Sequence, residues 1–186
     1  MADTTNDKGR AVPWRIIGWS IPPLILLLPM IANAPWTLFD YIVMGVMLGG
    51  AGLLVELVVR ASGNPAYRAG AFVAIAAIFL LVWVNGAVGF LGDEDNPANL
   101  MFGGVILVAV VGSVVLGFRA SGMAKAMFAA AAAQVLVGVI GLAGGFASPG
   151  AGGLYEVVMG TTLFGSMWLV SAGLFRKAAE EGVSAR

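Results

Sequence analysis

The densest group of chemically active side chains is a run of three acids, Asp93, Glu94 and Asp95. With Asp40 and Glu156 on the same predicted face, these carboxylates could hold Ca²⁺ or gather cations at an entrance. The alternative is electrostatic, because Asp40 and Glu156 both fall near a predicted first helical turn, where an acid stabilises the helix dipole. Consecutive carboxylates converge on one ion only in a folded loop, so we favour the electrostatic interpretation.

Three further polar side chains lie within long apolar runs: Glu56, Asn85 and Gln134. A carboxylate in such a run is a candidate for handling protons or cations. Glu56, however, precedes Arg60 by four residues, which is the favoured spacing for a helical ion pair. Asn85 and Gln134 could line a polar path, although amides in membrane helices more often bond to each other or to backbone carbonyls.

The chain contains neither cysteine nor histidine. Disulfides, thiolate metal sites, catalytic thiols and a Ser-His-Asp triad are therefore excluded. The usual proton shuttle at neutral pH is missing as well. We expect no enzymatic activity and no cofactor, and any bound metal would need oxygen ligands. The ten basic and ten acidic residues balance, so we expect no nucleic-acid partner.

The composition is that of a membrane protein. Hydrophobic residues make up 60% of the 186-residue chain and charged residues only 11%, and the mean hydropathy is +0.95. Soluble domains carry about 25% charged residues, so this chain could not cover a globule with polar surface. It should lie in a lipid bilayer.

Six apolar segments predict an all-α, polytopic helix bundle with six transmembrane helices. The expected transmembrane domain covers 13–176, between cytoplasmic tails at 1–12 and 177–186. Its predicted spans are 14–32, 36–60, 67–91, 98–118, 123–146 and 154–175. The first segment could instead be a signal peptide cleaved after Ala34. Pro35 directly after that bond disfavours cleavage, so retention is the preferred interpretation.

Charge placement predicts the orientation of the six spans. All ten basic residues fall at or near one set of ends: Lys8, Arg10, Arg15, Arg60, Arg68, Arg119, Lys125, Arg176, Lys177 and Arg186. By the positive-inside rule, both termini should be cytoplasmic. The expected location is a bacterial inner membrane, crossed several times.

Glycines recur at helical spacing inside the predicted spans. They form one pair and two stripes: Gly45 and Gly49; Gly86, Gly89 and Gly92; Gly138, Gly141 and Gly144. Small residues let membrane helices approach closely. The stripes therefore predict a compact bundle, or contacts with a second copy or with another membrane protein.

The segment 86–101, GAVGFLGDEDNPANLM, resembles a group of small, uncharacterised bacterial inner-membrane proteins that share a GDEDNPAN-type extracytoplasmic loop. The resemblance continues through Arg119 and the segment 122–128. It implies a bacterial membrane protein but transfers no activity and no functional residues.

The leading functional hypothesis is a non-enzymatic accessory or assembly subunit that acts through helix–helix contacts. Its partners would be the bilayer and either further copies of the chain or another membrane protein. One alternative is a small channel or transporter for a cation or small solute, using the candidate residues above. Another is a membrane enzyme that acts on lipid.

Overall fold

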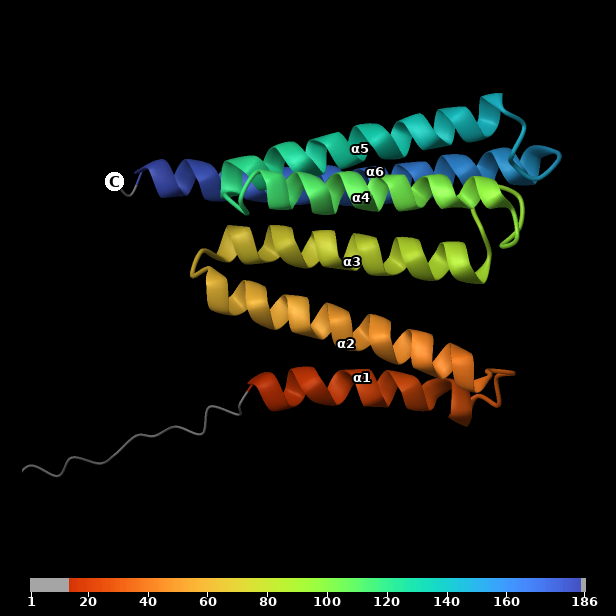
Figure 1. Cartoon of the computed structure of the whole chain (residues 1–186), viewed down its shortest axis with the longest axis horizontal. Helices are drawn as coiled ribbons and strands as arrows, with labels where there is room; N and C mark the ends of the chain where they lie inside the picture. The colour runs from red at the N-terminus through yellow and green to blue at the C-terminus, as the bar shows by residue number, and fades with distance from the viewer. Residues whose placement is uncertain (1–13, 185–186) are drawn as a thin grey trace, which may run out of the picture. The chain divides into compact units, whose positions relative to one another are not determined.

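The computed structural model describes residues 14–184, so the expected tail at 1–12 and the last two residues lie outside it. The described part is helical and contains no strand, which confirms the all-α class. Its elements are α1 (Trp14–Ile31), α2 (Leu38–Ala61), α3 (Pro65–Ala87), the 3₁₀ turn η1 (Pro97–Leu100), α4 (Met101–Val115), α5 (Ala120–Ala143) and α6 (Ala151–Ser184) (Figure 1).

Five helical segments in this part of the chain are long and apolar enough to cross a membrane. They are α2, α3, η1 with α4, α5 and α6, and α1 contributes a shorter apolar helix, Gly18–Ile31. A hydrocarbon core about 30 Å thick needs roughly 20 such residues per helix. The chain is a multi-pass membrane protein.

The chain divides into two compact units between Leu54 and Val55. The first contains α1 and most of α2. In it, Gly45 and Gly52 of α2 face Leu26 and Trp19 of α1, whereas no atom lies within 4 Å of a Cβ built on Gly49. Only part of the expected small-residue step therefore serves the contact between these two helices.

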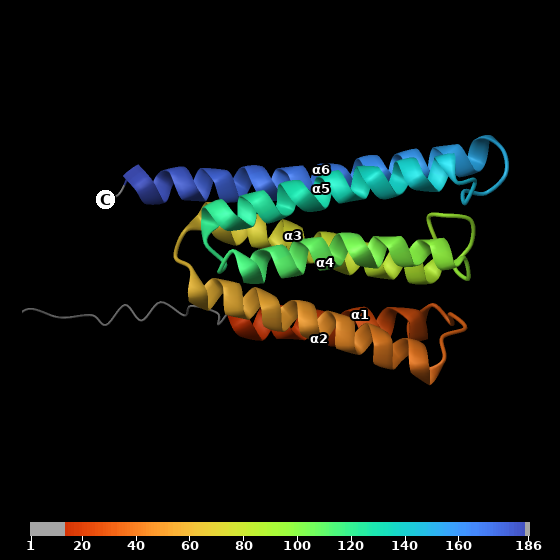
Figure 2. The ribbon, with the colours of Figure 1, turned by 45° about the horizontal axis from the view of Figure 1, so that its top comes forward.

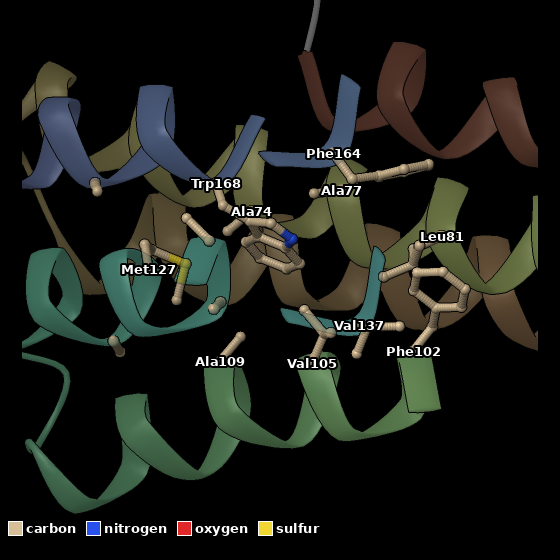
Figure 3. Close-up of a cluster of buried hydrophobic side chains, with 14 of the residues drawn as sticks. Ala74, Ala77, Leu81, Phe102, Val105, Ala109, Met127, Val137, Phe164 and Trp168 are labelled. Carbon is tan, nitrogen blue, oxygen red and sulfur yellow. The ribbon is translucent and has the colours of Figure 1, made fainter. Parts of the chain in front are cut away.

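The second unit contains the end of α2 and the four long helices α3 to α6, which run alongside one another (Figures 1 and 2). The α3–α4 and α5–α6 connections lie at one end of this bundle, called here the loop end. The α2–α3 and α4–α5 turns lie at the other, called here the turn end. A buried cluster fills the interior, in which Trp168 of α6 and the small residues Ala74 and Ala77 of α3 take part (Figure 3).

Small residues set the spacing between these helices. A Cβ on Gly70 of α3 would lie 3.2 Å from the Phe175 ring of α6, and one on Gly112 of α4 would lie 3.0 Å from Ala126 of α5. A Cβ on Gly138 of α5 would overlap the side chain of Thr161 of α6. Close backbone approach is how membrane helices gain contact area. The expected stripe on α5 is thus used within the chain.

Helix α3 ends at Ala87 instead of continuing to the expected Leu91. Gly89 and Gly92 adopt φ values of +73° and +84°, a region that glycine enters without a steric penalty. The chain leaves the helix there, so the expected stripe of Gly86, Gly89 and Gly92 does not form along one helix face.

Helix α6 continues past the expected end at Phe175 through Ser184. Two ion pairs at i, i+4 spacing support the added turns: Arg176 Nε lies 3.0 Å from Glu180 Oε1, and Lys177 Nζ lies 3.9 Å from Glu181 Oε1. Such pairs stabilise the solvated face of a helix. Within the same turns Ala178 is buried, and Asn64 Nδ2 donates a hydrogen bond to Glu181 Oε2 at 2.8 Å. The segment expected as a polar tail is therefore mostly helical.

Candidate functional site

The acidic loop between α3 and α4 is organised by the side chain of Asn99. Its Oδ1 accepts hydrogen bonds from the backbone N–H groups of Phe90 and Leu91, both at 3.0 Å. Its Nδ2 donates to the carbonyl oxygens of Asp93, at 2.6 Å, and Leu91, at 3.4 Å. One amide thereby bonds four backbone groups of the loop, which lie outside any helix and need partners other than a helical ladder.

A second asparagine joins this loop to the neighbouring one. Asn96 Oδ1 caps η1 by accepting from the Ala98 N–H at 3.0 Å, and its Nδ2 donates to the Phe146 carbonyl at 3.1 Å. The Ser148 hydroxyl donates to the Gly92 carbonyl, also at 3.1 Å. The α3–α4 and α5–α6 connections are therefore tied together at the loop end.

The same loop places apolar side chains over the end of the bundle. Leu91 is fully buried and lies against Gly141 of α5. The ring of Phe90 packs edge-on against Phe102 and Phe164, with centroids 5.6 and 5.5 Å apart, and against Gly160. The loop is a fitted apolar cap on the four helices.

Asp93, Glu94 and Asp95 in this loop are exposed, as is Glu156 on α6. Across residues 14–184, no three acidic side chains come close enough to hold a metal ion. Asparagine amides and backbone groups hold the loop in shape. The acids place negative charge at the loop end without converging on one point.

Asp40, in the first unit, forms a capping box with Thr37 at the start of α2. Its Oδ2 accepts from the Thr37 N–H at 2.6 Å and from the Thr37 hydroxyl at 2.8 Å, and the Asp40 N–H lies 3.4 Å from that hydroxyl. This reciprocal arrangement satisfies free backbone donors at a helix N-terminus. The Asp40 carboxylate therefore stabilises the N-terminus of α2.

Glu56 forms the ion pair with Arg60 that their spacing predicts. Glu56 is 8% exposed, whereas 62% of the Arg60 side chain is exposed. The arginine therefore neutralises a buried carboxylate while keeping its own head near the surface. This pair anchors the last turn of α2 at the turn end.

Asn85 and Gln134 lie on different helices and do not bond to each other. Asn85 Nδ2 donates to the Leu81 carbonyl of its own helix at 2.9 Å, while its Oδ1 is buried without a partner. Gln134 is fully buried in α5, and neither its Oε1 nor its Nε2 has a hydrogen-bond partner. Thr161 Oγ1 and Trp168 Nε1 of α6 are buried without partners as well.

Three serine hydroxyl groups in the spans donate to backbone carbonyls. Ser113 donates to Ala109 on its own helix at 2.7 Å, and Ser166 donates to Thr162. Ser171 of α6 donates across to the Gly70 carbonyl of α3 at 2.8 Å. These groups act within and between helices and do not join Asn85 and Gln134 into a continuous polar line.

No family model matches the chain, and no curated protein or solved structure is significantly similar to it. The function must therefore be argued from the chain itself.

Sequence reasoning singled out the acids of the α3–α4 loop and missed the asparagine and serine that shape it. Asn99 and Ser148 make their bonds to groups 6 to 56 residues away in the chain. The available signal was composition: two asparagines around a proline, in Asn96-Pro97-Ala98-Asn99, are typical of a side-chain-capped turn.

Proposed function

We propose that the chain is a six-span protein of a bacterial inner membrane with both termini in the cytoplasm. Its turn end, which carries Arg60, Arg68, Arg119, Lys125, Arg176 and Lys177, then faces the cytoplasm, as the positive-inside rule requires. The acids of the α3–α4 loop face outward.

Within that membrane, the chain acts as a non-enzymatic accessory or assembly subunit through lateral helix contacts. One observation carries this proposal: Asn85, Ser113 and Ser171 bond to backbone carbonyls, and Gln134 is fully buried in the apolar core. A path for ions or polar solutes would need such groups lined up along a wetted route. The second unit is instead built as a packed scaffold.

The face of α4 offers a surface for a lateral partner. Exposed residues recur along it at alternating spacings of four and three: Leu100, Gly104, Leu107, Val111 and Val114. No atom lies within 4 Å of a Cβ built on Gly104. A stripe at this spacing, with a glycine in it, suits a second helix packed at close range.

Native mass spectrometry of the tagged protein, extracted mildly from its own membrane, tests the proposal. We expect a different membrane protein to be retained in fixed stoichiometry. A photo-crosslinking residue at Leu107 should capture that protein, whereas the same residue at Leu136, an equally exposed position on α5, should capture little. Recovery of only a monomer or homo-oligomer would contradict the accessory role.

A flux assay in proteoliposomes addresses the transport alternative. Solute or cation flux that disappears in Asn85→Leu, with the melting temperature unchanged, would favour a channel or transporter. We expect no flux above that of empty vesicles.

A further inference from the structure

A groove of about 570 Å³ opens at the turn end, between the start of α5 and the end of α6. Its walls are mostly apolar and include Ala124 and Phe128 of α5 and Ala179 of α6. Lys125, Arg176 and Glu180 place charges along its rim. The groove thus combines an apolar floor with ionic groups, which is the pattern of an amphipathic ligand site.

The charges in the groove do not cancel. Arg176 pairs with Glu180 at 3.0 Å, but Lys125 has no carboxylate partner among residues 14–184. Two cations and one carboxylate leave one net positive charge. That charge complements a ligand carrying a single negative charge, such as a phosphodiester.

The start of α5 adds to this positive field. Arg119 is the N-cap residue, and no side chain there accepts a hydrogen bond from the first turn. Free backbone N–H groups and the helix dipole therefore favour an anion beside Ser121, which also lines the groove.

The depth of the groove in the bilayer fits a lipid better than a soluble anion. Lys125 and Phe128 both belong to the α5 segment long and apolar enough to span the membrane. Phe128 is 46% exposed, so its ring meets whatever occupies the groove. A lysine one turn from the end of a span reaches the interface through its alkyl chain, which places the ammonium at headgroup level.

We propose that this groove binds an anionic phospholipid, with the phosphodiester at Lys125 and Arg176 and an acyl chain along Phe128 and Ala124. Basic pockets between membrane helices are suited to such headgroups. The proposal rests on insertion of the chain in a membrane and is independent of the accessory role, because the groove lies entirely within α5 and α6.

The test is lipid titration of the delipidated, full-length protein in mild detergent, with bound lipid counted by native mass spectrometry. We expect phosphatidylglycerol to bind more tightly than phosphatidylethanolamine of the same chains. Lys125→Gln should weaken phosphatidylglycerol binding about fivefold, since one cation near the surface contributes on the order of a factor of five. It should leave phosphatidylethanolamine binding unchanged.

Lys177→Gln is the matched control, because it removes a neighbouring charge of α6 outside the groove lining and should change neither affinity. Ala179→Leu keeps every charge but places a larger side chain in the apolar floor of the groove. It should therefore weaken binding of both lipids. Equal binding of the two lipids by the unmodified protein would overturn the proposal. So would equal losses in Lys125→Gln and Lys177→Gln, or displacement of the lipid by millimolar inorganic phosphate.

Discussion

At the scale of single residues, the polar side chains divide by the sequence distance to their partners. The Glu56–Arg60 pair and the Thr37–Asp40 box join residues three or four apart, so helical spacing alone indicates them. Asn99 binds groups whose positions depend on where α3 ends. Composition indicates a capped turn here, but the partners of Asn99 could not be predicted, because they depend on a loop in which Gly89 and Gly92 adopt positive φ.

Asn99→Leu should destabilise the protein by roughly 2 to 6 kcal/mol, since four hydrogen bonds to backbone groups are lost at about 0.5–1.5 kcal/mol each. Chemical unfolding in detergent micelles measures this change. Glu94→Gln, which alters an exposed side chain of the same loop, is the control and should leave stability unchanged. A loss below 0.5 kcal/mol in Asn99→Leu would show that the amide does not hold the loop.

Gln134→Leu should stabilise the protein by about 1 kcal/mol. The amide is fully buried and both its polar atoms lack partners, so a leucine of similar size removes a desolvation penalty without leaving a cavity. Thermal unfolding of the purified protein provides the measurement. Gln134→Glu should lower the melting temperature, because it buries a carboxyl group at the same place. Destabilisation by the leucine would mean that the amide has a partner in the membrane.

At the scale of helices, sequence indicates the existence and class of each element better than its ends. Apolar length predicted the helices α1 to α6, but the end of α3 depends on loop geometry, and the extension of α6 depends on ion pairs and on contacts with the bundle such as the Asn64–Glu181 hydrogen bond. A repeated tetrapeptide makes the same point. Arg60-Ala61-Ser62-Gly63 spans the end of α2, whereas Arg119-Ala120-Ser121-Gly122 spans the start of α5. Tertiary context, not the local sequence, decides which structure forms.

Gly141→Ala should destabilise the bundle by about 1 to 3 kcal/mol, the usual cost of overpacking a core. The added methyl group would overlap the buried side chain of Leu91, so the effect should reach the α3–α4 loop. Gly165→Ala is the control, because no atom lies within 4 Å of a Cβ at that position of α6. Adding Leu91→Val should recover part of the loss, and additive effects in this double-mutant cycle would contradict the contact.

At the scale of the whole molecule, the absence of cysteine makes the proposed orientation directly measurable. A single cysteine at exposed Glu94 of the α3–α4 loop, or at exposed Lys177 beyond the apolar part of α6, can be labelled without background.

With six spans and cytoplasmic termini, a membrane-impermeant maleimide should label Glu94→Cys in spheroplasts and label Lys177→Cys only after permeabilisation. The reversed pattern would place the basic turn end outside, against the positive-inside rule. Labelling of both positions in intact spheroplasts would mean that α6 does not cross the membrane, because the α3–α4 loop and the C-terminal end of α6 lie at opposite ends of the α3–α6 bundle (Figure 1).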